Sequence, residues 1–143
     1  MSPVDHEVIR RKLAVLQNAL AALAEAGSID LDTYRRDFWR RKGTERVLQE
    51  MIEAGMDIAT HVLVQTGRAA PADGRAALLE LGSAAVISPE LARALAPAVG
   101  LRNRLVHEYE EIDDQIVFAA VSQAQSLFPR FIAEIEGFLG RTP

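Results

Sequence analysis

The chain has 143 residues with 49% apolar and 25% charged side chains, the usage of an ordinary soluble domain rather than of a disordered or collagen-like chain. It contains no cysteine, which excludes a disulfide framework, a thiolate zinc site, an iron–sulfur cluster and a cysteine nucleophile. Its net charge of −4 argues against a protein that coats nucleic acid by bulk electrostatics, so any contact with nucleic acid has to be local.

The first residues, MSPVDHEVIRRK, carry charges where a secretory signal would need an apolar stretch, and no apolar run approaches about 18 residues. We therefore expect a soluble, cytoplasmic protein that does not enter a membrane. The length predicts one domain, 1–143.

The apolar period is helical from the start of the chain. Apolar residues over 9–23 recur at steps of four and three, the stripe of an amphipathic helix. Ser2, Pro3 and Asp5 are expected to supply its N-cap, a first-turn proline and a capping-box acid. Gly27 is expected to end this helix.

A polar turn over 28–32 is followed by a second helical stretch that reaches about Gly67. Gly43 is expected to mark a bend, or the boundary between a short leading helix and the main one. Residues 67–74, GRAAPADG, are the most loop-like part of the chain, and a short helix over about 75–81 follows.

The last third of the chain predicts further helices. A helix begins at 88–90 and runs toward Gly100, and 101–107 is expected to be helical as well. The final helix covers about 113–139, with a kink at Pro129. No strand-like alternation competes, so the fold class is all-α, an up-and-down four-helix bundle with additional short helices.

Three polar groups that rarely gather on one short helix occur in RNRLVHEY, from Arg102 to Tyr109: a cation, an imidazole and a phenol. At about 100° per residue, Arg102 and His107 lie about 140° apart on an ideal helix. Their convergence needs a wrapped arginine side chain, a break near Gly100, or a second copy of the helix across a two-fold axis, which favours a dimer. The alternative is a surface helix end at which Arg102, Arg104 and His107 complement the helix dipole.

Glu53, Asp57 and His61 follow one another at i, i+4 steps on the long second helix and form a polar stripe. No metal is expected, because the Glu-x-x-His pairs of di-iron bundles are missing from the sequence. A partly buried carboxylate that orients a base or an arginine of a neighbouring helix makes Asp57 and Glu53 candidate supporting residues. The simplest interpretation remains an intrahelical hydrogen-bonded pair at the helix surface.

A basic run lies near the start of the same helical stretch. It consists of Arg35, Arg36, Arg40, Arg41, Lys42 and Arg46, with Phe38 and Trp39 inside it and only Asp37 and Glu45 opposing. Such a run can hold phosphates and stack a base, and a solvated face with aromatic anchors is an equal alternative. The acidic stretch 108–114, EYEEIDD, would repel RNA and could attract a cationic partner.

The stretch RNRLVHEYEEID, 102–113, matches the R-x-x-x-x-H-x-Y signature of HepT-like proteins of the HEPN superfamily, and the chain resembles these prokaryotic toxin ribonucleases. GTERVLQEMIEAGMDIATHVL looks like the family's long second helix, and ISPELARALAPAVGLRNRLVH looks like the helix that leads into the motif. The resemblance covers about residues 5–138 and is weakest in the opening helix.

The resemblance implies a homodimeric, metal-independent endoribonuclease that uses no cofactor and whose two motif helices meet at the dimer interface. It implies that Arg102 and His107 are the catalytic pair and that Asn103 is an adjacent polar contributor. It further implies that Tyr109 accepts AMP from a minimal nucleotidyltransferase antitoxin. RNA supplies its own nucleophile, the 2′-hydroxyl, so a histidine and an arginine suffice for proton transfer and charge stabilisation.

Two other functions are compatible with the residues. The first is a noncatalytic HEPN module that binds RNA or a nucleotide and regulates a partner nucleotidyltransferase, which the acidic net charge favours. The second is a plain helical dimerisation protein, which gives no reason for Arg102, His107 and Tyr109 together.

Overall fold

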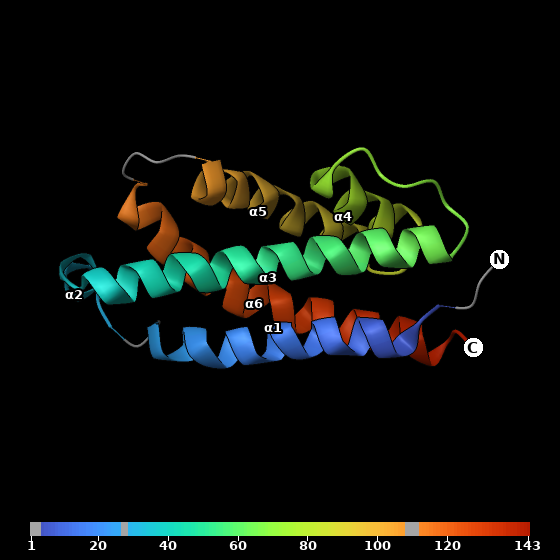
Figure 1. Cartoon of the computed structure of the whole chain (residues 1–143), viewed down its shortest axis with the longest axis horizontal. Coiled ribbons are helices and arrows are strands. Elements are labelled where there is room, and N and C mark those ends of the chain that lie inside the picture. The colour runs from blue at the N-terminus through green and yellow to red at the C-terminus, as the bar shows by residue number, and fades with distance from the viewer. Residues whose placement is uncertain (1–3, 27–28, 108–111) are drawn as a thin grey trace.

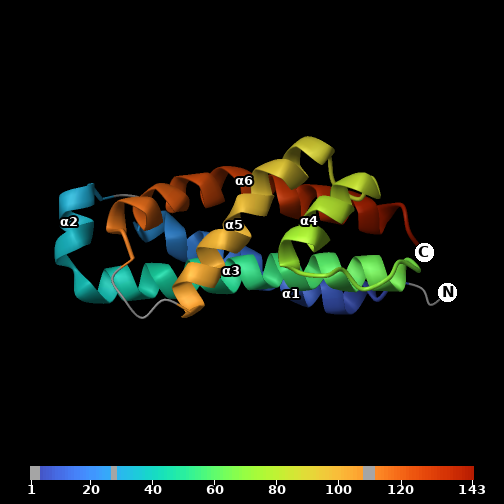
Figure 2. The ribbon, with the colours of Figure 1, turned by 90° about the horizontal axis from the view of Figure 1, so that it is seen from above.

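A computed structural model of the chain describes residues 4–26, 29–107 and 112–143. These residues form six helices and contain no strand: α1 (His6–Ala26), α2 (Leu31–Arg36), α3 (Phe38–Gln65), α4 (Gly74–Ser83), α5 (Pro89–His107) and α6 (Asp114–Gly140). The four long helices α1, α3, α5 and α6 run alternately in opposite directions (Figure 1). Seen from above, α5 crosses α3 obliquely (Figure 2). The all-α, up-and-down bundle with additional short helices is confirmed.

One apolar core joins the helices, with α3 packed against α1, α4, α5 and α6. The predicted stripe of α1 faces the core, because four of its side chains are almost completely buried and Leu20 is partly buried; the four are Ile9, Leu13, Leu16 and Leu23. Each such side chain stabilises the fold by about 1.5–3 kcal/mol relative to an exposed one. The core therefore holds α3 firmly in place, and α3 positions the site described below.

The start of α1 differs from the prediction. The helix begins at His6, and the carboxylate of Asp5 accepts a hydrogen bond from the backbone N–H of Val8 at 3.2 Å. Asp5 is therefore the N-cap itself rather than an acid inside the first turn. Residues 2–3 and Gly27, which were expected to begin and end the helix, lie outside the described residues.

The boundary between the short leading helix and the long one lies at Asp37, and the prediction of Gly43 was wrong. The N–H of Asp37 donates to the carbonyl of Tyr34 at 3.2 Å, and its carboxylate accepts from the N–H of Arg40 at 3.0 Å. One residue thus ends α2 and caps α3. The N–H of Arg40 holds the pKa of this carboxyl below its usual value. Gly43 lies inside α3, where glycine costs only about 1 kcal/mol relative to alanine.

α5 is one helix where two segments were predicted. It continues through Gly100, and a Cβ at that position would meet nothing within 4 Å. Pro97 also lies inside the helix on an exposed face, where its missing N–H leaves one carbonyl of the previous turn to water. The break near Gly100 that could have brought Arg102 and His107 together is therefore absent.

α6 is helical at Pro129 and on both sides of it. An 18-residue window of α6 has a mean hydropathy of 1.2, so the helix is long and apolar enough, by length and composition alone, to cross a membrane. The sequence of α6 contains no uninterrupted apolar run of that length. One side of α6 is buried against the rest of the bundle, including Phe128, Phe131 and Ile135, whereas Ile116 is 43% exposed. A core helix meets the same criterion, so we treat α6 as a core helix.

Candidate functional site

Arg102 of α5 extends toward α3 and meets Glu53. Oε1 of Glu53 lies 3.1 Å from Nε and 3.1 Å from NH2 of Arg102. The side chains are 24% and 34% exposed, so the pair is partly shielded from water and still reachable from solvent. An exposed ion pair contributes about 0–1 kcal/mol to stability, so the main effect of Glu53 is to orient the guanidinium. The contact is of the kind expected from the polar stripe: a carboxylate and an arginine of a neighbouring helix.

Two amide side chains complete this contact. Nε2 of Gln49 donates to Oε1 of Glu53 at 3.1 Å, and NH1 of Arg102 donates to Oδ1 of Asn103 at 3.2 Å. The hydrogen bonds from Nε to Glu53 and from NH1 to Asn103 use two of the five N–H donors of Arg102, so both terminal nitrogens keep N–H groups that can reach an anion. Gln49 was not predicted from the sequence. Its position one helical turn before Glu53 is the pattern that could have identified it as a hydrogen-bond partner of Glu53.

His107 is exposed and is the last residue of α5. Among the described residues, no hydrogen bond or ion pair joins it to Arg102. His107 instead continues a stripe with Gly100 and Arg104 at steps of four and three residues. One chain therefore presents Arg102 toward α3 and His107 on another side of the same helix.

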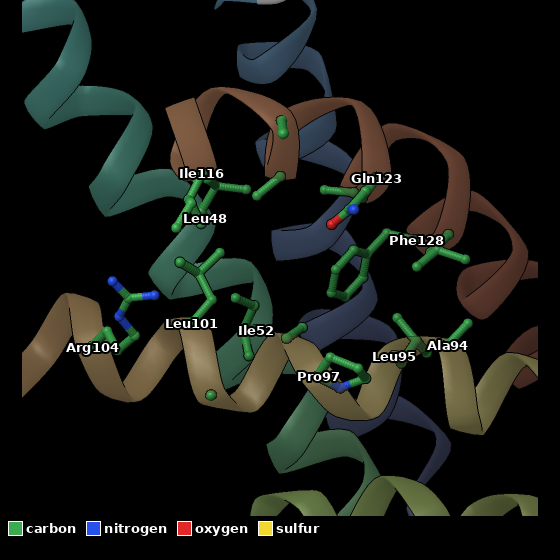
Figure 3. Close-up of a pocket in the computed structure, with 16 residues that line it drawn as sticks. Leu48, Ile52, Ala94, Leu95, Pro97, Leu101, Arg104, Ile116, Gln123 and Phe128 are labelled. Atoms are coloured by element: carbon green, nitrogen blue, oxygen red, sulfur yellow. The ribbon is translucent and has the colours of Figure 1, made fainter. Parts of the chain in front are cut away.

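The stripe of Gly100 and Arg104 borders an apolar cavity of about 570 Å³ between α3, α5 and α6. Figure 3 shows Arg104 at one end of this cavity and Phe128 toward the other, with Pro97 on the α5 wall. Apolar side chains such as Leu101 form most of the remaining lining. The cavity thus lies on the side of α5 that leads to His107.

The rest of the polar stripe of α3 lies elsewhere. Asp57 is 63% exposed and pairs with Lys12 of α1 at 3.6 Å, so of the two candidate supporting carboxylates only Glu53 contacts Arg102. Nε2 of His61 is buried and makes no hydrogen bond among the described residues. The same part of the chain contains no group of three or more His, Cys, Asp or Glu side chains arranged to hold a metal ion.

Tyr109 lies outside the described residues, together with most of the acidic stretch. Helices lie on both sides of it in the chain: His107 ends α5, and Asp113 caps α6 by accepting a hydrogen bond from the N–H of Gln115 at 2.9 Å. The next residue, Asp114, lies 3.9 Å from NH1 of Arg41 in α3. The beginning of α6 is thus tied to α3.

The basic run surrounds two exposed aromatic side chains at the beginning of α3. Phe38 is 51% and Trp39 is 81% exposed, and their rings meet edge to face with centroids 5.4 Å apart. The cationic groups of Arg41 and Lys42 each lie 5.7 Å from the centre of the Phe38 ring. The two aromatic residues therefore do not serve as core anchors within this chain.

The sequence as a whole matches known proteins. The family model described as Ribonuclease HepT-like matches residues 16–135. The chain is 36% identical over 139 residues to the tRNA nuclease HepT of Aphanizomenon flos-aquae, covering 97% of this chain and 95% of that protein. It is 28% identical over 131 residues to the mRNA nuclease HepT of Shewanella oneidensis, covering 92% and 98%.

A solved structure shares the fold. The tri-AMPylated HEPN toxin of Shewanella oneidensis, in complex with MNT antitoxin, superposes with a TM-score of 0.83 at 28% identity. The match covers 93% of this chain and 99% of that one.

Proposed function

Because the chain belongs to the Ribonuclease HepT-like family, we propose that it is a metal-independent endoribonuclease and the toxin of a toxin–antitoxin pair. The main structural support is the contact between Glu53 and the motif arginine, Arg102. This contact orients the guanidinium at the protein surface, where its remaining N–H groups can bind a phosphate. The relatives named as tRNA and mRNA nucleases support the choice of RNA as substrate.

In the proposed reaction the 2′-hydroxyl of RNA attacks the adjacent phosphorus, the bond to the 5′-oxygen breaks, and a 2′,3′-cyclic phosphate forms. One proton leaves the 2′-oxygen and one reaches the departing 5′-oxygen. His107 transfers one of these protons, and Arg102 stabilises the negative charge that develops on the phosphoryl oxygens. Asn103 keeps the guanidinium in place through its bond to NH1. Neither role needs a metal ion.

The separation of Arg102 from His107 supports a homodimer as the active form. α5 is continuous and Arg102 is directed to Glu53, so neither a helix break nor a wrapped side chain joins the pair within one chain. A second copy seated on the apolar cavity beside Gly100 would bring its motif helix next to the first. The small exposed residues of the α5 wall would allow close approach of the two helices.

The proposed partner is a nucleotidyltransferase antitoxin, as the Shewanella toxin in complex with MNT antitoxin suggests. In the proposed modification the phenol oxygen of Tyr109 attacks the α-phosphorus of ATP and pyrophosphate leaves. The attached AMP adds a negative charge two residues from His107, so both repulsion and bulk oppose RNA binding. We place both proteins in the cytoplasm, where RNA and ATP are available.

The alternative function is a noncatalytic module that binds RNA or a nucleotide and regulates its partner nucleotidyltransferase. The net charge of −4 and the acidic residues on both sides of Tyr109 favour this alternative. Incubation of the purified protein with RNA in the presence of a chelator separates the two. Cleavage products that end in a 2′,3′-cyclic phosphate support the ribonuclease, and intact RNA that is nevertheless bound supports the regulatory module.

A further inference from the structure

Trp39 is the single tryptophan of the chain and, among the residues that the structure describes, the most exposed of the large apolar side chains, at 81%. It lies in the first turn of α3, next to Phe38. A tryptophan ring in this position offers an aromatic surface to a flat ligand. Trp39 lies outside the motif, and the proposed cleavage reaction does not use its side chain.

A shallow hollow of about 410 Å³ lies beside Trp39, between the last turns of α1 and the first turns of α3. Apolar groups of both helices line it, and Gly43 leaves room because no side chain projects there. Asp37 and Arg40 supply polar groups at its wall, and NH1 of Arg40 donates to the carbonyl of Glu25 on the α1 side at 3.3 Å. The hollow is large enough for a nucleobase and has an aromatic wall and hydrogen-bonding groups.

One face of α3 leads from Trp39 to the proposed catalytic arginine. Trp39, Arg46 and Glu53 are seven residues apart, so they lie within about 40° of one another on an ideal helix. Glu53 in turn contacts Arg102. Trp39 and Glu53 are separated by about 21 Å along the helix axis, which a strand of several nucleotides spans and a dinucleotide does not.

The charge around Trp39 is opposite to that of the whole chain. Six cationic and two acidic residues occur over 35–46, whereas the net charge of the chain is −4. Some of the cations have acidic neighbours, such as Arg46 with Glu50 at 3.0 Å and Lys42 with Glu45 at 3.7 Å. The cationic side chains themselves are more than half exposed, 65% for Arg46 and 52% for Lys42, so phosphates can compete for them.

We propose that Trp39 and the hollow beside it form a second RNA contact, at which a base of a single-stranded segment stacks on the indole ring. The proposal rests on the proposed ribonuclease function and extends its RNA contact beyond the motif. Exposed aromatic rings among cations are the recurring composition of single-strand binding surfaces. Arginine is also the side chain whose planar fork suits phosphate. RNA is therefore favoured here over a protein partner.

The first test uses the fluorescence of Trp39, which no other tryptophan obscures. The probe is an unstructured, fully 2′-O-methylated oligouridylate, which has no 2′-hydroxyl to attack. We expect saturable quenching that weakens as salt rises. Binding seen by the anisotropy of a labelled probe without any change in tryptophan emission would place the RNA elsewhere. The absence of binding by either readout would also refute the contact.

The second test compares W39A with V64A, which truncates another exposed apolar side chain at the far end of α3. W39A should bind the labelled oligonucleotide about five- to hundredfold more weakly, the range for loss of one stacked base. Its kcat/KM should fall on a long RNA and stay unchanged on a dinucleotide, whereas V64A should match the parent on both. An equal loss on both substrates would overturn the proposal, and so would weakened antitoxin binding with unchanged RNA binding.

These outcomes separate the two proposals. If the parent protein cleaves no RNA, the ribonuclease is refuted, and the fluorescence titration still decides whether RNA binds at Trp39. If the parent cleaves long RNA and W39A cleaves it at the same rate, the ribonuclease stands and the second contact is refuted.

Discussion

Oε1 of Glu53 accepts a hydrogen bond from Nε of Arg102 at 3.1 Å, and NH2 of the same guanidinium lies 3.1 Å from this oxygen as an ion pair. The two residues are 49 positions apart in the sequence and belong to α3 and α5. Because Nε and NH2 of the guanidinium both lie 3.1 Å from one carboxylate oxygen, the carboxylate orients the guanidinium. Glu53 is thus a positioning residue for the proposed catalytic arginine.

R102A and H107A are each expected to remove RNA cleavage while helicity stays unchanged. Loss of general acid–base help costs about 10²–10⁴-fold, and loss of a group that stabilises transition-state charge costs about 10²–10³-fold. Gel assays of cleavage with and without chelator measure both effects, and R93A, an exposed arginine of the same helix, is the control. Cleavage by either variant at the parental rate would show that the catalytic pair is misassigned.

E53Q tests the positioning of Arg102. The amide keeps one oxygen acceptor and loses the charge, so kcat should fall about tenfold or more with a smaller change in KM, because a misdirected guanidinium acts mainly in the transition state. D57N is the matched control, since Asp57 pairs with Lys12 on α1 and should leave kcat unchanged. A loss of kcat in D57N equal to that in E53Q would mean that general charge, and not the contact with Arg102, matters.

The proposed dimer predicts that sedimentation gives twice the 15.7 kDa mass of the chain. G100E places a charged side chain at the cavity, where a Cβ meets nothing within the chain. The fold should therefore persist while the dimer dissociates and cleavage is lost. G140E, at an equally open position near the end of α6, should remain dimeric and active. A G100E variant that is monomeric and fully active would exclude a shared site.

Tyr109 is the proposed acceptor of AMP. Y109F keeps the ring and removes only the hydroxyl, so it should retain cleavage and escape silencing by a nucleotidyltransferase antitoxin supplied with ATP. Intact-mass spectrometry measures the added nucleotides. Equal adenylate additions on Y109F and on the parent would place the acceptor elsewhere, and loss of cleavage in Y109F would give the hydroxyl a catalytic role.

The buried phenol of Tyr34 is expected to make the fold less stable at alkaline pH. Burial raises its pKa well above 10, and the carboxylates of Glu45 and Asp114 raise it further. The phenol therefore contributes stability that is complete below the unfolded pKa of about 10 and is lost as pH rises above it. Urea midpoints of Y34F should decline less than those of the parent above about pH 10. Parallel declines would indicate that other groups control alkaline unfolding.

The sequence predicted the helices well where a stripe of large apolar residues recurred, as in α1 and α6, because burial of that stripe decides the structure. Breakpoints were harder to predict. Glycine at positions 43 and 100 predicts a bend or a helix end, yet Gly43 and Gly100 both lie inside helices, since packing of the neighbouring turns outweighs the cost of about 1 kcal/mol for one glycine. Asp37 marks the true boundary through its two capping bonds.

At the site, spacing along one helix identified Glu53 as a supporting carboxylate but did not distinguish it from Asp57. The difference arises from the crossing of α5 over α3, which brings Arg102 to Glu53, and from α1, which brings Lys12 to Asp57. Such choices depend on tertiary packing and not on helical period. The roles of His107 and Tyr109 stay predictions.

The segment 108–111 joins two well-anchored points, since His107 ends a packed helix and Asp113 caps the next one. One residue separates Tyr109 from His107 in the sequence, so the chain allows at most about 7 Å between their Cα atoms. A nucleotide attached to Tyr109 would then act as a tethered competitor, at an effective concentration on the order of millimolar whatever the cellular supply. Dilution or excess RNA would not release such a block, and activity would return only when the phosphodiester bond is cleaved.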